Sequence, residues 1–90
     1  MAQWIKTDGT ITEVEPANGK DFSLIEVKRF IGGGYVEVIG VRDGLMLLDE
    51  DGKRKQLPVN ELATAVALPV LQRGDFIVGD VLVCKRGQIK

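Results

Sequence analysis

The sequence contains no histidine, and this absence excludes several common classes of enzyme and metal site. Without histidine there is no Ser-His-Asp or Cys-His arrangement, no histidine general acid or base, and almost no conventional zinc site. The run 49–52 does not fit a calcium loop either, because Lys53 stands where a third ligand belongs. We therefore expect no metal, no cofactor and no enzyme of the common types.

Cysteine and long apolar runs are also scarce. The single cysteine, Cys84, cannot form a disulfide within the chain, which indicates a reducing cytosol. The longest apolar stretch, residues 63–71, is interrupted by Thr64 and Pro69 and is too short to span a membrane. The first residues lack the apolar run of a signal peptide. We expect a cytoplasmic protein with no membrane partner.

The chain also has no large excess of charge of either sign, since it contains 12 Lys and Arg and 13 Asp and Glu. A net charge of −1 creates no field that would draw in duplex nucleic acid, so none is expected as a partner. The 90 residues predict a single domain over 1–90. A chain of this length buries only about 60 % of its unfolded surface, which favours a homo-oligomer.

Local signals predict a small α+β domain. Ser23 and Glu26 form a capping box that begins a helix over residues 23–31, and the glycines 32–34 end it. Asn60 begins a short helix that Pro69 ends; its residues 61–68 are apolar all round, so we expect it to be buried. β-Prone runs are found at 3–7, 10–15, 35–39, 45–48, 53–57, 76–78 and 81–84. They predict a mostly antiparallel, curled sheet of five to six strands, with 45–48 in the centre and 76–84 as a hairpin or bulged strand pair.

The best candidate binding site is the start of the second helix. Free amides after Asn60 would face an anion, and Thr64, one turn later, adds a hydroxyl. Lys53 and Lys55 precede them on a predicted strand, where they share one face and could hold a phosphate. Tyr35 follows the glycines and could contact a base or ribose. Each residue also has a structural role open to it: helix cap for Asn60, charged edge strand for the lysines, surface position for Tyr35.

Four motifs give the chain a family resemblance. They are GGYVEV (33–38), DEDGK (49–53), LPVNELAT (57–64) and GDFIVGDVLV (74–83). Over roughly residues 30 to 85 the chain resembles a family of small domains of unknown function, carried mainly by bacteriophages, plasmids and conjugative elements. The resemblance implies a bacterial host cytoplasm.

Three functions remain open at this point. The first is a mobile-element protein that sequesters a nucleotide immune signal without catalysis, using Tyr35, Lys53, Lys55, Asn60 and Thr64, with subunit interfaces completing the pocket. The second is a protein-interaction module that inhibits or regulates a host enzyme through an exposed strand edge. The third is a carboxylate-dependent hydrolase using Glu37, Asp49 or Asp75, which the missing histidine disfavours.

Overall fold

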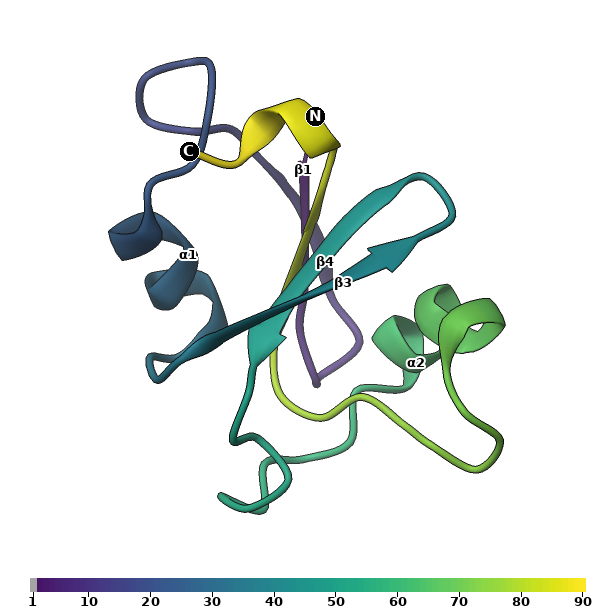
Figure 1. Ribbon diagram of the computed structural model, residues 1–90. Helices are drawn as coiled ribbons and strands as arrows, with labels where there is room; N and C mark the ends of the chain where they lie inside the picture. Colours follow the sequence, from purple (N-terminus) through teal and green to yellow (C-terminus); the bar gives the residue numbers. More distant parts are fainter. Residues whose placement is uncertain (1) are drawn as a thin grey trace.

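A computed structural model describes residues 2–90, in which five strands form one antiparallel sheet (Figure 1). Across the sheet the strands follow the order β2-β1-β5-β4-β3. Along the chain the elements are β1 (Ala2–Ile5), β2 (Ile11–Val14), α1 (Leu24–Ile31), β3 (Val36–Val41), β4 (Gly44–Asp49), α2 (Glu61–Ala67), η1 (Leu68–Val70), β5 (Val81–Cys84) and η2 (Arg86–Gln88).

The predicted α+β class is confirmed, but the predicted curl is wrong. The sheet is open and not strongly curled, with β2 and β3 at opposite edges instead of paired with each other. The predicted central strand is displaced as well: β4 is an inner strand beside the edge, whereas β5 occupies the middle between β1 and β4.

Helix α1 begins and ends where its capping signals predict. The Ser23 hydroxyl accepts the Glu26 amide at 3.2 Å, and the Glu26 carboxylate accepts the Ser23 amide at 3.0 Å. At the other end, Gly32 adopts a left-handed conformation (φ 89°) and its amide bonds back to Lys28. Glycine tolerates this conformation without strain, so Gly32 ends the helix as the sequence predicts.

Helix α2 is only half buried, which corrects the expectation that all its sides would be covered. Its buried residues are Ala63 and Ala67, whereas Leu62 and Val66 remain exposed. Small side chains on the inner side allow the helix backbone to approach the sheet closely, and the bulkier residues face outward.

The predictions of a strand at 53–57 and of a strand pair at 76–84 are wrong, because turn bonds and contacts with distant segments determine these regions despite their β propensity. Residues 50–56 form turns, in which the Lys55 amide bonds to the Asp51 carbonyl and the Leu57 amide to that of Gly52. The run 76–78 does not pair with 81–84: Val78 forms an isolated bridge with Val59, and β5 pairs with β1 and β4.

The sheet carries a hydrophobic core on each face, which gives three layers. Figure 1 shows α1 on one side of the strands and α2 on the other. Phe22 and Val27 pack with Leu47 and Leu82 on the α1 side. The α2 side contains Ile5, Val41, Met46, Leu48, Ala63, Ala67, Ile77 and Val81. No helix among residues 2–90 is long and apolar enough to cross a membrane.

Candidate functional site

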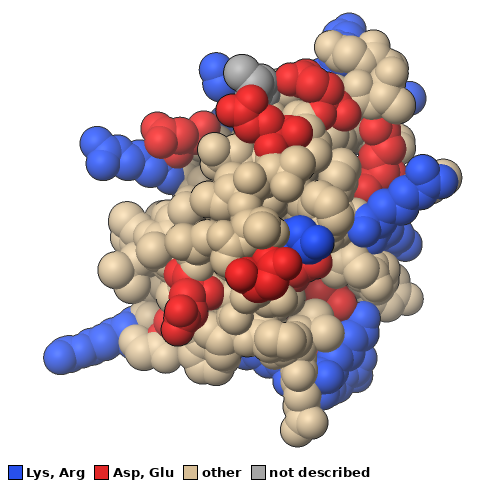
Figure 2. Space-filling view, turned by 180° about the vertical axis from the view of Figure 1, so that it is seen from behind, with Lys and Arg blue, Asp and Glu red and all other residues tan. Residues whose placement is uncertain are grey.

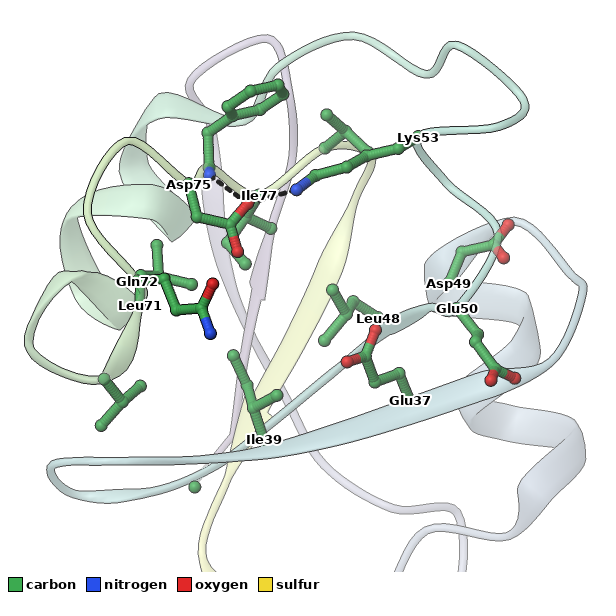
Figure 3. Close-up of a pocket in the computed structure, with 14 residues that line it drawn as sticks. Glu37, Ile39, Leu48, Asp49, Glu50, Lys53, Leu71, Gln72, Asp75 and Ile77 are labelled. Atoms are coloured by element: carbon green, nitrogen blue, oxygen red, sulfur yellow. Dashed lines mark hydrogen bonds and ion pairs between the residues drawn. The ribbon is translucent and has the colours of Figure 1, made fainter.

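A cleft of about 600 Å³ lies on the α2 face of the sheet. One wall is the β3–β4 hairpin and the other is the segment 70–78 that follows helix α2 (Figure 3). The cleft is defined by the residues that line it, which are Glu37, Ile39, Gly40, Leu48, Asp49, Glu50, Lys53, Val70, Leu71, Gln72, Asp75, Phe76, Ile77 and Val78.

Hydrogen bonds to the region around Asn60 fix the second wall of the cleft. The Ile77 carbonyl accepts the Asn60 amide at 2.8 Å, and the Ile77 amide donates to the Thr64 hydroxyl at 2.9 Å. The Gly79 amide bonds to the Pro58 carbonyl. The buried side chains of Ile77 and Leu48 then form an apolar floor between the two walls.

An ion pair between Lys53 and Asp75 lies at the mouth of the cleft. The Asp75 carboxylate also accepts the Phe76 amide, and the Lys53 ammonium lies 4.7 Å from the centre of the Phe76 ring. The hydrogen bond from Lys53, helped by the Phe76 amide, lowers the pKa of Asp75 below its usual value of 3.8. Asp75 is therefore a carboxylate near neutral pH and cannot act there as a general acid.

The charges facing the cleft are mostly negative. Four carboxylates and one ammonium line it. Lys53 pairs with Asp75, and Lys55 pairs with the buried Asp49 at 2.7 Å, whereas Glu37 and Glu50 have no ion pair among the described residues. In Figure 3 the Glu37 carboxylate points into the cleft, and Glu50 points away from it. The cleft thus favours a cation or hydrogen-bond donor and opposes a phosphate.

Figure 2 shows charges of both signs on the face seen from behind: acidic side chains gather along its upper rim, basic ones lie at the lower right, and one group of each sign lies near the centre. Among residues 2–90, no three His, Cys, Asp or Glu side chains are placed to hold a metal ion.

The predicted phosphate site does not assemble from its predicted residues. The Asn60 side chain is 0 % exposed: it accepts the Ala63 amide and donates to the carbonyls of Ile5 and Gly79. The Thr64 hydroxyl donates to the Asn60 carbonyl at 2.8 Å while accepting the Ile77 amide. Both side chains are occupied in holding the fold, so neither is free for a ligand.

The remaining predicted residues are dispersed. Lys53 lines the cleft, but Lys55 is turned toward Asp49 instead of sharing a face with Lys53, because 50–56 is a turn and no strand. Tyr35 is 71 % exposed and does not line the cleft. Glu37, Asp49 and Asp75, which the sequence offered as hydrolase carboxylates, all line it. Gln72 was missed, since an isolated glutamine in a loop carries no sequence signal.

The chain belongs to a family of unknown function. The family model described as "Domain of unknown function (DUF3846)" matches residues 5–89, which includes every element that forms the cleft. No curated protein and no solved structure shows a significant match to the chain.

Proposed function

We propose that this member of the DUF3846 family binds a small molecule in the cleft, without covalent chemistry or turnover. The observation that carries the proposal is the Glu37 carboxylate, which has no ion pair among residues 2–90 and is directed over an apolar floor of Leu48 and Ile77. A volume of about 600 Å³ suits a compact organic ligand, since ligand pockets usually measure about 300–1,000 Å³.

The chemistry of the cleft favours a flat or apolar body that carries hydrogen-bond donors, as a nucleobase with an exocyclic amine does. The amine would donate to Glu37, and the ring would lie against Ile39 and Leu48 or stack on Phe76. Ribose hydroxyls could bond to Gln72 or Asp75. A phosphate would extend outward past Lys53, the one cation among the described residues that line the cleft.

This arrangement modifies the sequestration hypothesis without abandoning it. The nucleotide ligand, the origin in a phage or other mobile element, and the bacterial cytoplasm all stay predictions that come from the sequence. Sequestration requires tight binding without turnover. The lack of histidine supports binding over histidine-dependent hydrolysis.

Calorimetric titration of a panel of nucleosides, nucleotides, cyclic dinucleotides and ADP-ribose derivatives tests the proposal. We expect nucleosides to bind at least as tightly as the matching nucleotides, because the cleft attracts donors and repels phosphate. Glu37→Gln should weaken binding about tenfold or more, since a hydrogen bond to a charged group contributes about 1.5–3 kcal/mol.

Glu50→Gln is the matched control, because Glu50 belongs to the same rim but points away from the cleft. It should bind like the wild-type protein. The cleft is not the binding site if the two variants lose affinity equally, and the nucleobase assignment fails if no panel member binds the wild type.

The second candidate function, a module that inhibits or regulates a host enzyme, has one observation in its favour. The outer edge of β3 is unpaired among residues 2–90, so another polypeptide could add a strand there. A host protein that copurifies with the wild-type chain and is lost from a Val38→Pro variant would support it.

A further inference from the structure

Strand β3 is an apolar sheet edge with little protection against pairing. It has six residues, and Glu37 is its only charged side chain. The opposite edge, β2, has four residues, of which Thr12 and Glu13 are polar. Natural edge strands are usually shortened, charged or covered because their free backbone groups attract other strands. The β3 edge is neither shortened nor covered by another strand among the described residues, and Glu37 is the one charge on it.

The hydrogen-bond pattern of the β3–β4 hairpin identifies which backbone groups face outward. The Glu50 amide donates to the Tyr35 carbonyl at 2.9 Å, so residue 35 belongs to the set that bonds toward β4. Bonding alternates along an antiparallel pair, which places Glu37, Ile39 and Val41 in the same set. The amides and carbonyls of Val36, Val38 and Gly40 therefore point away from the sheet.

We propose that two copies of the chain pair through their β3 edges, antiparallel, about a twofold axis at Val38. Only this register uses all three outward-facing residues. It places Val38 opposite the partner's Val38 and Val36 opposite the partner's Gly40. A register centred at residue 37 would instead place two glutamates opposite each other, which is destabilising. The self-complementary strand fits a second copy of this chain, and a twofold interface is the commonest kind in oligomers.

An apolar groove continues the contact surface beyond the strand itself. It measures about 170 Å³ and lies between β3, α1 and the C-terminal residues, over the buried Phe22 and Leu47. Val36, Val38 and Leu24 line it, and Val38 and Leu24 are exposed. Pairing at β3 would cover Val38 and bring the partner's apolar side chains beside this groove, which removes exposed apolar surface from water.

The proposed dimer also completes the cleft, a point that rests on the proposed function. Glu37 and Ile39 line the cleft from β3. In the register centred at Val38, the partner's Ile39 lies opposite Glu37, and the partner's Glu37 lies opposite Ile39. The two clefts then open on one face of a continuous sheet, and each receives two side chains from the other subunit.

Sedimentation equilibrium of the ligand-free full chain tests the pairing. We expect a mass of twice 9.8 kDa for the wild-type protein at micromolar concentration. Val38→Lys should raise the dimer dissociation constant at least about tenfold, because it opposes two like charges across the axis. Ile11→Lys is the matched control: Ile11 and Val38 are each 50 % exposed on an edge strand. It should leave the dimer unchanged.

A charge-swap experiment tests the register. The Val38→Lys and Val38→Asp proteins should each dimerise more weakly than the wild type when alone, and a mixture of the two should form a mixed dimer, because this register places residue 38 opposite its own copy. A monomeric wild type, or dissociation caused by Ile11→Lys and not by Val38→Lys, would overturn the proposal. Titration of the nucleoside panel into Val38→Lys, at a concentration where it is monomeric, is a separate measurement. Affinities equal to those of the wild-type dimer would show that the partner contributes nothing to the cleft, even where the dimer itself is confirmed.

Discussion

At the scale of single residues, the Asn60 side chain makes more hydrogen bonds than the helix cap that its sequence context indicates. The capping role was predictable from the sequence, because Asn60 precedes an apolar helical run. Its two other bonds, to the carbonyls of Ile5 and Gly79, were not predictable, since they connect positions 55 and 19 residues away. Asn60 thereby links α2 to β1 and to the loop before β5.

We predict that Asn60→Ala destabilises the protein by about 2–4 kcal/mol, more than the loss of about 1 kcal/mol expected for an ordinary helix cap. The additional cost arises because the Ile5 and Gly79 carbonyls would lose their donor in a buried site. Urea unfolding measures the difference, with Ser23→Ala, the cap of α1, as the comparison. Asn60→Asp keeps the cap acceptor but loses both donors; a fully stable Asn60→Asp protein would contradict this account.

At the scale of elements, helix α1 and the loop 50–56 show what the sequence does and does not specify. Every signal that defines α1 lies within a few residues of its ends, so the sequence locates the helix correctly. The loop contains an apparent β-hairpin signal at Asp51-Gly52. Turn bonds within the loop and the pairing of Lys55 with the buried Asp49 instead fold it back, and propensity cannot reveal an ion pair that depends on burial.

Glu26 should make the stability of α1 depend on pH. The amides of Ser23 and Ala17 donate to its carboxylate and lower its pKa below the usual value of 4.5. A carboxyl group with a lowered folded pKa contributes stability above its unfolded pKa, and this contribution disappears as the pH falls through the folded pKa. We predict that Glu26→Gln is less stable than wild type at about pH 7 and that the difference shrinks toward about pH 3.

Urea unfolding of wild type and Glu26→Gln across this pH range measures the effect. Glu15→Gln, at an exposed position before Pro16, is the control and should follow the wild-type curve. A gap between wild type and Glu26→Gln that stays constant down to low pH would assign the effect to the shape of the side chain and not to its charge.

The cleft marks the limit of sequence reasoning at this scale. Its walls come from β3, β4 and the segment 70–78, which are joined by the packing of Ile77 and Leu48 in one core. Glu37 and Asp75 attract attention in the sequence as carboxylates beside strands. Their shared orientation depends on contacts between segments more than 30 residues apart, which no local pattern records.

At the scale of the whole molecule, one sheet separates two cores that share its strands. Ile77 and Val81 lie on the α2 side, whereas Leu82 lies on the α1 side together with Val27. Neighbouring residues of β5 therefore serve opposite cores. Loss of either core would remove the support of the sheet on one face and leave the other core without its base.

We predict that the two cores unfold as a single unit. Ile77→Val shortens a buried side chain in the α2-side core and should cost about 0.5–1.5 kcal/mol. Trp4 reports on the opposite face, because its ring lies 5.2 Å from that of Phe30 and its indole N–H bonds to the Phe30 carbonyl. The urea midpoint followed by Trp4 fluorescence should shift together with that followed by far-UV circular dichroism. Leu68→Val, at an exposed position, should move neither. If Ile77→Val lowers the dichroism midpoint and leaves the Trp4 midpoint in place, the layers unfold separately and the sheet does not couple them.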